Sequence, residues 1–73
     1  MTNTLFITLQ NDAAAIERVL QCARFRRFTI YTFSGESTKE QTFLTLKVSG
    51  SSAIEHLIAQ MRKMHCVREV QLQ

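Results

Sequence analysis

The sequence predicts an α+β sandwich in which two helices cover one face of a four-stranded antiparallel sheet, in the order β-α-β-β-α-β. Two observations support this. Two stretches carry apolar residues at helical spacing, and four others alternate apolar and polar residues. The chain has 73 residues, 45% of them hydrophobic, which is enough for one domain and too few for two. We therefore expect residues 1–73 to form a single domain.

The first half of the chain reads as a strand followed by a helix. Residues 4–10 are rich in β-formers, with Leu5, Ile7 and Leu9 on one face. Asn11 and Asp12 follow, and we expect them to cap and favour a helix start with their side-chain oxygens. The helix then presents one apolar face, formed by Ile16, Val19, Leu20 and Ala23.

Two further strands are expected on either side of a polar loop. Residues 28–34 alternate, with Phe28 and Ile30 on one face and Tyr31 and Phe33 on the other. Residues 35–40 contain a glycine and are otherwise mostly polar, which indicates a hairpin loop. Residues 41–49 alternate again, and the face expected to meet the helices carries Leu44, Leu46 and Val48.

The last third repeats the helix and strand. Residues 52–55 read Ser-Ala-Ile-Glu, the pattern of a capping box, and the helix is expected to end near Met64. Its apolar face consists of Ile54, Leu57, Ile58 and Met61. Residues 67–72 form the last strand. Short connections and right-handed crossovers make this order a ferredoxin-like βαββαβ sandwich.

The sheet face without helices is predicted to be a contact surface. Strand parity places seven residues there, namely Phe6, Thr8, Tyr31, Phe33, Phe43, Thr45 and Lys47. Four of them are aromatic, and a cluster of aromatic side chains on one face indicates an interface. Burying them could contribute on the order of 5 kcal/mol, which is comparable to the stability of a small domain. We therefore expect a second polypeptide at Phe6, Tyr31, Phe33 and Phe43, through dimerisation or docking.

The remaining polar and sulfur side chains have simple structural interpretations. The cluster of Arg24, Arg26 and Arg27 complements the negative end of a helix, although it could also bind phosphate. Cys22 and Cys66 are expected to be free thiols, with a single bridge between them as the alternative.

The sequence predicts neither a catalytic nor a metal site. His56 and His65 have no partner at metal-ligand spacing, and no nucleophilic triad or phosphate loop is present. No apolar run has membrane-spanning length, and the N-terminus lacks the pattern of a leader. We therefore expect a soluble, cytoplasmic protein that is not itself an enzyme. A net charge of +3 is compatible with an acidic protein or with nucleic acid as partner.

One helical segment carries a family resemblance. Residues 16–20 read Ile-Glu-Arg-Val-Leu and are followed by Arg24, Arg26, Phe28 and Ile30. This pattern, over essentially the full chain, resembles the amino-acid-binding ACT domain family. Within that family it is most similar to the branch of small, non-catalytic subunits of acetolactate synthase isozyme II.

The resemblance implies a function. The chain would contribute no cofactor of its own and would bind an acetolactate synthase large subunit that uses thiamine diphosphate, Mg²⁺ and FAD. It would activate that subunit in branched-chain amino-acid biosynthesis by binding one of its conformations better than others. The family also implies a homodimer formed through the sheet.

The resemblance also locates an effector site, which we expect to be weak. The positions that correspond to it are Asn11, Asp12, Ala13, Ala14 and Ile16. Effector-binding members commonly have Pro-Gly where this chain has Ala13 and Ala14, so a methyl group would occupy space that a ligand needs. A second departure is Arg27, where the family usually has the glycine that ends the helix. A left-handed backbone at a non-glycine residue costs about 1–2 kcal/mol, so Arg27→Gly is predicted to raise stability.

Three other functions fit the same order of elements. A free-standing ACT regulator would sense an amino acid and control some other enzyme. An RNA-recognition motif would stack bases on the open sheet face, but residues 39–46 lack its glycine and two of its three aromatic residues. A metal carrier of this fold would need Cys-x-x-Cys after the first strand, and residues 11–14 contain no cysteine.

Overall fold

The structure is a computed structural model that describes residues 2–73. It confirms the predicted fold class, with four antiparallel strands, two helices and the order βαββαβ. The elements are β1 (Thr2–Gln10), α1 (Ala15–Phe25), β2 (Thr29–Ser37), β3 (Gln41–Ser49), α2 (Ile54–Arg62) and β4 (Val67–Leu72). No helix in the described residues is long and apolar enough to cross a membrane.

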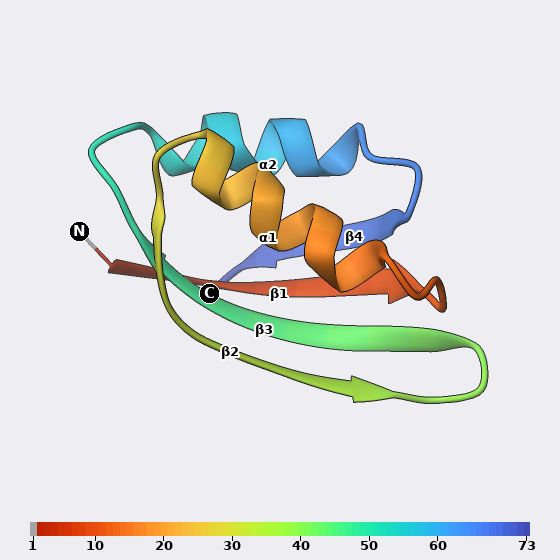
Figure 1. Cartoon of the computed structure of the whole chain (residues 1–73). Coiled ribbons are helices and arrows are strands. Elements are labelled where there is room, and N and C mark those ends of the chain that lie inside the picture. The colour runs from red at the N-terminus through yellow and green to blue at the C-terminus, as the bar shows by residue number, and fades with distance from the viewer. Residues whose placement is uncertain (1) are drawn as a thin grey trace.

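The strands form one sheet in the order β2-β3-β1-β4, so β1 and β3 are central and β2 and β4 are edges. β1 and β3 pair without interruption from Thr2 opposite Ser49 to Gln10 opposite Gln41. Figure 1 shows both helices on one face of this sheet, with α1 oblique to α2 and the other face uncovered.

The core lies between the helices and the sheet, where the alternation predicted it. The inward residues of β1 and β3 are almost fully buried, as are the apolar residues on the inner faces of both helices. They include Leu5, Ile7, Leu9, Leu44, Leu46, Val48, Val19, Ala23, Leu57, Ile58 and Met61. Strict period-2 alternation in β1 and β3 is what directs one apolar face of each strand to the helices.

α1 ends in a Schellman motif, and Arg27 has the predicted left-handed conformation with a φ of 67°. The Arg27 N–H donates to the Arg24 carbonyl at 2.9 Å, and the Phe28 N–H donates to the Ala23 carbonyl at 3.0 Å. These two bonds satisfy carbonyls at the helix end that would otherwise lack a partner. Phe28 is buried beside Ala23, which completes the motif with an apolar contact.

Both predictions about helix starts are wrong. α1 begins at Ala15 with Ala14 as its N-cap residue, and no side chain caps it. α2 begins at Ile54, so Ala53 is the N-cap residue and the predicted capping box of Ser52 and Glu55 does not form. Ile54, the first residue of α2, packs against the core.

The hairpin between β2 and β3 is shorter than predicted. β2 continues through Gly35 to Ser37, which leaves only residues 38–40 for the turn. Gly35 does not have a positive φ, so it adopts ordinary extended backbone and can pair with Leu44. Ser37 also pairs with Thr42, and their hydroxyl oxygens lie 2.9 Å apart. These contacts carry the strand pairing past the glycine.

A bulge in β2 corrects the predicted position of Phe33. The register jumps between Ile30, which pairs with Val48, and Thr32, which pairs with Lys47. Phe33 therefore pairs with Leu46, which is buried against the helices, and cross-strand partners share a face. Phe33 lies on the helix side of the edge strand and does not share the open face with Phe6.

Candidate functional site

A hollow of about 300 Å³ lies where the β1–α1 turn meets the β2–β3 hairpin. Its lining residues are Asn11, Asp12, Ala13, Ile16, Ser37 and Thr42. Four of the five residues expected to correspond to an effector site therefore line it, and Ala14 does not. The structure brings Ser37 and Thr42 to the same place, which the sequence analysis missed. Whether an effector binds in this hollow stays a prediction.

The polar side chains of the hollow already bond to one another. The Thr42 hydroxyl donates to Asn11 Oδ1 at 2.8 Å, so the hydrogen between Ser37 Oγ and Thr42 Oγ1, 2.9 Å apart, comes from Ser37. Asn11 Nδ2 donates to the Thr38 carbonyl at 2.6 Å. The Asn11 side chain therefore ties the β1–α1 turn to the hairpin. Asn11 Nδ2 keeps a second N–H, and Asn11 Oδ1 and Ser37 Oγ keep lone pairs, so these groups can still bond to a ligand.

Asp12 holds the turn that leads into α1. Its Oδ1 accepts the Ala14 N–H at 2.9 Å, which is an Asx-turn geometry. Its Oδ2 lies 3.8 Å from Arg18 Nη1, and both side chains are exposed, so this ion pair contributes little. Ala13 and Ala14 lie outside the positive-φ region, so the backbone here does not require glycine.

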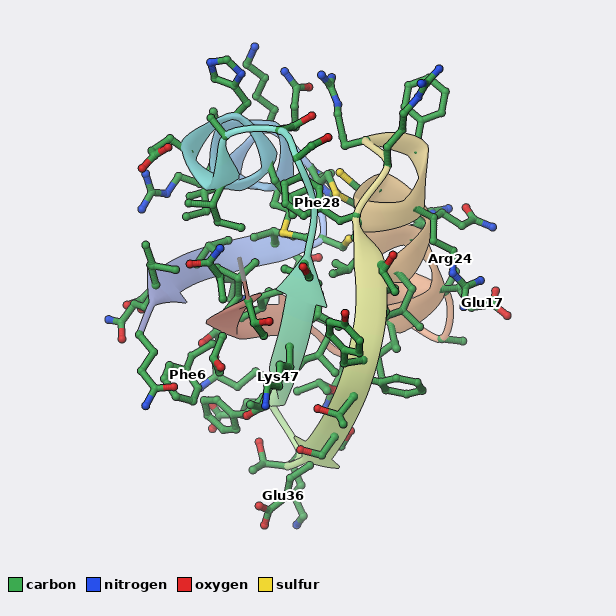
Figure 2. All side chains as sticks on the ribbon, turned by 90° about the vertical axis from the view of Figure 1, so that its left-hand side faces the viewer. Phe6, Glu17, Arg24, Phe28, Glu36 and Lys47 are labelled. Atoms are coloured by element: carbon green, nitrogen blue, oxygen red, sulfur yellow. The ribbon has the colours of Figure 1, made fainter. Side chains whose placement is uncertain are left out.

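The open face of the sheet has a small aromatic centre. Phe6 is opposite Thr45, Phe43 is opposite Thr8, and the two rings are therefore diagonal neighbours on the central strands. Their exposed fractions are 42% and 45%. Figure 2 shows Phe6 and Lys47 on the side of the sheet away from the helices, whereas Phe28 lies on the helix side. Four aromatic residues were expected on this face, and Phe33 is not among them because it lies on the other side, while Tyr31 is the extra residue of the bulge.

The β2 edge carries two further exposed aromatic residues. Every residue of β2 except Ile30 is exposed, including Tyr31 and Phe33. Gly35 faces α1, since a Cβ added to it would lie 3.9 Å from Cδ1 of Ile16 on that helix. A nine-residue edge strand with exposed aromatic residues presents unpaired backbone groups that another strand can bond.

The cysteines are free, and the described residues contain no metal cluster. Cys66 is buried and Cys22 is half-buried. Burial raises the pKa of the Cys22 thiol, and the nearby Arg26 guanidinium opposes this in part. Within residues 2–73 no group of three or more histidine, cysteine, aspartate or glutamate side chains gathers that could hold a metal ion.

Comparison with known families decides which family this domain represents. The sequence pattern of the ACT domain matches residues 11–70. The chain belongs to the ACT domain family. ACT domains are regulatory and non-catalytic, and this assigns the chain its general role. None of the curated proteins compared with the sequence matches it.

Solved structures share the fold at low sequence identity. The ACT domain of GTP pyrophosphokinase from Chlorobium tepidum is 12% identical with a TM-score of 0.85, covering 100% of this chain and 97% of that one. The acetolactate synthase small subunit from Thermotoga maritima is 20% identical with a TM-score of 0.83, covering 99% and 47%. An ACT domain protein from Streptococcus pneumoniae is 13% identical with a TM-score of 0.81, covering 100% and 88%. These likenesses support the fold, and this chain spans about half the length of the Thermotoga small subunit.

Proposed function

We propose that this protein is a small, non-catalytic regulatory subunit of acetolactate synthase, of the isozyme II type. It would activate a thiamine-diphosphate-dependent catalytic subunit in branched-chain amino-acid biosynthesis, in the cytoplasm. In this proposal residues 1–73 form one ACT-like domain. Thiamine diphosphate, Mg²⁺ and FAD all belong to the catalytic partner.

The observation that carries the proposal is the helix of residues 16–20 inside the segment that matches the ACT domain. Its Ile-Glu-Arg-Val-Leu order and the arginine-rich end resemble the isozyme II branch of small subunits. The Thermotoga small subunit shows that an acetolactate synthase uses this fold in its small subunit.

The experiment is reconstitution with a purified acetolactate synthase large subunit. We expect the chain to co-elute with the large subunit in size-exclusion chromatography and to raise its rate of acetolactate formation. A matched control replaces this chain with an unrelated ACT domain of similar size. Absence of both the complex and the activation, with a large subunit that retains basal activity, would contradict the proposal.

We propose further that the free chain is a homodimer. The β2 edge favours this, since pairing two antiparallel β2 strands would bury Tyr31 and Phe33 and extend the sheet across both copies. Replacing Thr32 by proline removes a backbone N–H near the centre of the strand. In sedimentation velocity we expect this variant to have a larger monomer fraction than the wild type. A wild-type chain that sediments as a monomer at all concentrations would refute the dimer.

A second candidate is a free-standing amino-acid sensor, which the hollow at the β1–α1 turn favours. Ile16 and Ala13 would contact an apolar side chain there. A rise in melting temperature with one specific amino acid, and no binding to the large subunit, would favour the sensor over the synthase subunit.

A further inference from the structure

The outer surface of the helix layer contains a second hollow, of about 490 Å³, between α1 and α2. Its residues are Arg18, Gln21, Cys22, Phe25, Arg26, Gln60 and Met64. The α1 members recur every three or four residues and therefore form one face of that helix. We name this surface the interhelix groove. It lies on the opposite side of the molecule from Phe6 and Phe43.

The interhelix groove combines an apolar interior with a cationic border. Cys22 and Met64 are half-buried, whereas Phe25 is 84% exposed, the largest exposure among the large apolar side chains of residues 2–73. A phenylalanine ring left in water beside such a groove indicates a contact surface. The groove contains two guanidinium groups and no carboxylate.

The charges of the groove are available to a partner. The only ion pair recorded between side chains in residues 2–73 joins Arg18 to Asp12 at 3.8 Å, and its exposure makes it weak. Arg26 lies near Cys22. A protonated thiol carries no charge, so Cys22 does not form an ion pair with the Arg26 guanidinium. Neither guanidinium therefore has a strong partner inside the molecule.

The whole net charge of the chain lies in the helix layer. Residues 11–28 and 50–66 contain six of the nine basic residues and three of the six acidic ones, a net charge of +3. The strands and the hairpin carry three of each sign and are neutral. Complementary potentials steer and orient association, so a partner of opposite charge would meet this layer.

We propose that the interhelix groove docks an acidic, apolar-anchored segment of a partner polypeptide. An apolar side chain of that segment would lie between Phe25 and Met64, and its carboxylates would pair with Arg18 and Arg26. A polypeptide fits better than RNA, because the groove has an apolar interior and only two guanidinium groups. The inference rests on the proposed function for its biological partner, the catalytic subunit, and its physical test does not.

The first test uses a fluorescein-labelled twelve-residue peptide in which leucines at helical spacing are surrounded by glutamates. Its binding to the full chain is followed by fluorescence anisotropy and by amide shifts of the ¹⁵N-labelled chain. We expect shifts centred on Gln21, Phe25 and Gln60, and affinity that weakens as salt rises. The double variant Arg18→Gln/Arg26→Gln is expected to weaken binding by about tenfold or more. Phe25→Ala should weaken it without changing the salt dependence.

The matched control is Arg24→Gln/Lys47→Gln, which removes the same net charge from outside the groove. Arg24 is on α1 but does not line the groove, and Figure 2 shows it extending away from the core. The control should bind within about twofold of the wild type, since only long-range steering changes. Equal weakening by both double variants, peptide shifts centred on Phe6 and Phe43, or binding of a single-stranded RNA in place of the peptide would each overturn the proposal.

The second test applies the same variants to the large subunit of acetolactate synthase. Loss of the complex with Arg18→Gln/Arg26→Gln, and its retention with the control, is the expected result. If the groove variant still binds like the wild type, the docking inference fails while the proposed function stands. If the wild type does not bind the large subunit, the proposed function fails, and the peptide titration alone decides the groove. Circular dichroism and melting of each variant check that the fold is intact.

Discussion

The contact between Gly50 and Phe28 gives the sharpest test of how the domain is packed. An added Cβ at Gly50 would lie 2.7 Å from Phe28 Cδ1, 3.0 Å from Cε1 and 3.1 Å from Cγ. Carbon atoms normally pack at about 3.5–4.0 Å. The Phe28 side chain is buried next to the core and closes the Schellman motif of α1, so the ring has little freedom to move. Gly50→Ala therefore forces a clash.

The expected loss follows from two opposing terms. Overpacking of this kind typically costs about 1–3 kcal/mol. Gly50 does not have a positive φ, so alanine is conformationally allowed and gains about 0.4–1 kcal/mol through the unfolded state. The net prediction is a loss of about 1–2 kcal/mol, which corresponds to several degrees in melting temperature for a domain of this size.

The assay is urea unfolding at equilibrium, with Gly35→Ala as the matched control. A Cβ at Gly35 would meet Leu44, Phe43 and Ile16 at 3.6–3.9 Å, which is ordinary contact, so that variant should be as stable as the wild type or slightly more stable. Combining Gly50→Ala with Phe28→Leu should recover part of the loss, which a double-mutant cycle measures. A Gly50→Ala domain as stable as the wild type, with unchanged m, would refute the packing argument.

Three further predictions concern single residues. Arg27→Gly relieves a left-handed residue and should raise the free energy of unfolding by about 0.5–1 kcal/mol, which a thermal melt detects; a lower melting temperature would contradict this. Thr42→Val removes the buried hydroxyl that links Asn11 and Ser37 and should cost about 1 kcal/mol in urea unfolding; unchanged stability would mean that the links contribute nothing. Burial raises the pKa of the Cys22 thiol, so the stability it contributes is complete below the ordinary thiol pKa and is lost as the pH rises through the folded value. Relative to Cys22→Ala, the wild type should therefore lose more stability between pH 7 and pH 10, and parallel losses in both proteins would contradict the assignment.

The fold was predictable because, in most helices and strands, the apolar residues keep one spacing along the whole element. β1 and β3 have their inward positions where alternation puts them, and the bounds of β3 and β4 match the prediction. Both helices bury the faces that their spacing indicated. The left-handed backbone of Arg27 followed from the resemblance, because the ACT family usually has the glycine that ends the helix at this position.

β2 could not be predicted to the same depth. The large apolar residues of β2 (Thr29–Ser37) change parity after Ile30, because Tyr31 and Phe33 stand at odd positions, and the sequence does not show where the bulge falls. The bulge depends on pairing with β3, which is a tertiary contact, and it alone decides the face of Phe33.

The candidate site was predictable on one side only. Asn11 and Asp12 mark the turn, but Ser37 and Thr42 reach the hollow from a hairpin 25 residues or more away in sequence. Thr42 did leave a signal, since it is the polar member of an inward series that continues with Leu44, Leu46 and Val48, and it is only 6% exposed. A polar residue at a buried position of an alternating strand indicates a hydrogen-bonded contact.

The uneven distribution of charge between the two layers has a consequence for the molecule in solution. A neutral sheet under a cationic helix layer makes the domain an electric dipole that points across its thickness. Near an acidic surface the domain would rotate before contact, so that the helix layer faces that surface. The rate of productive encounters would then depend on ionic strength even where the final contact is mainly apolar.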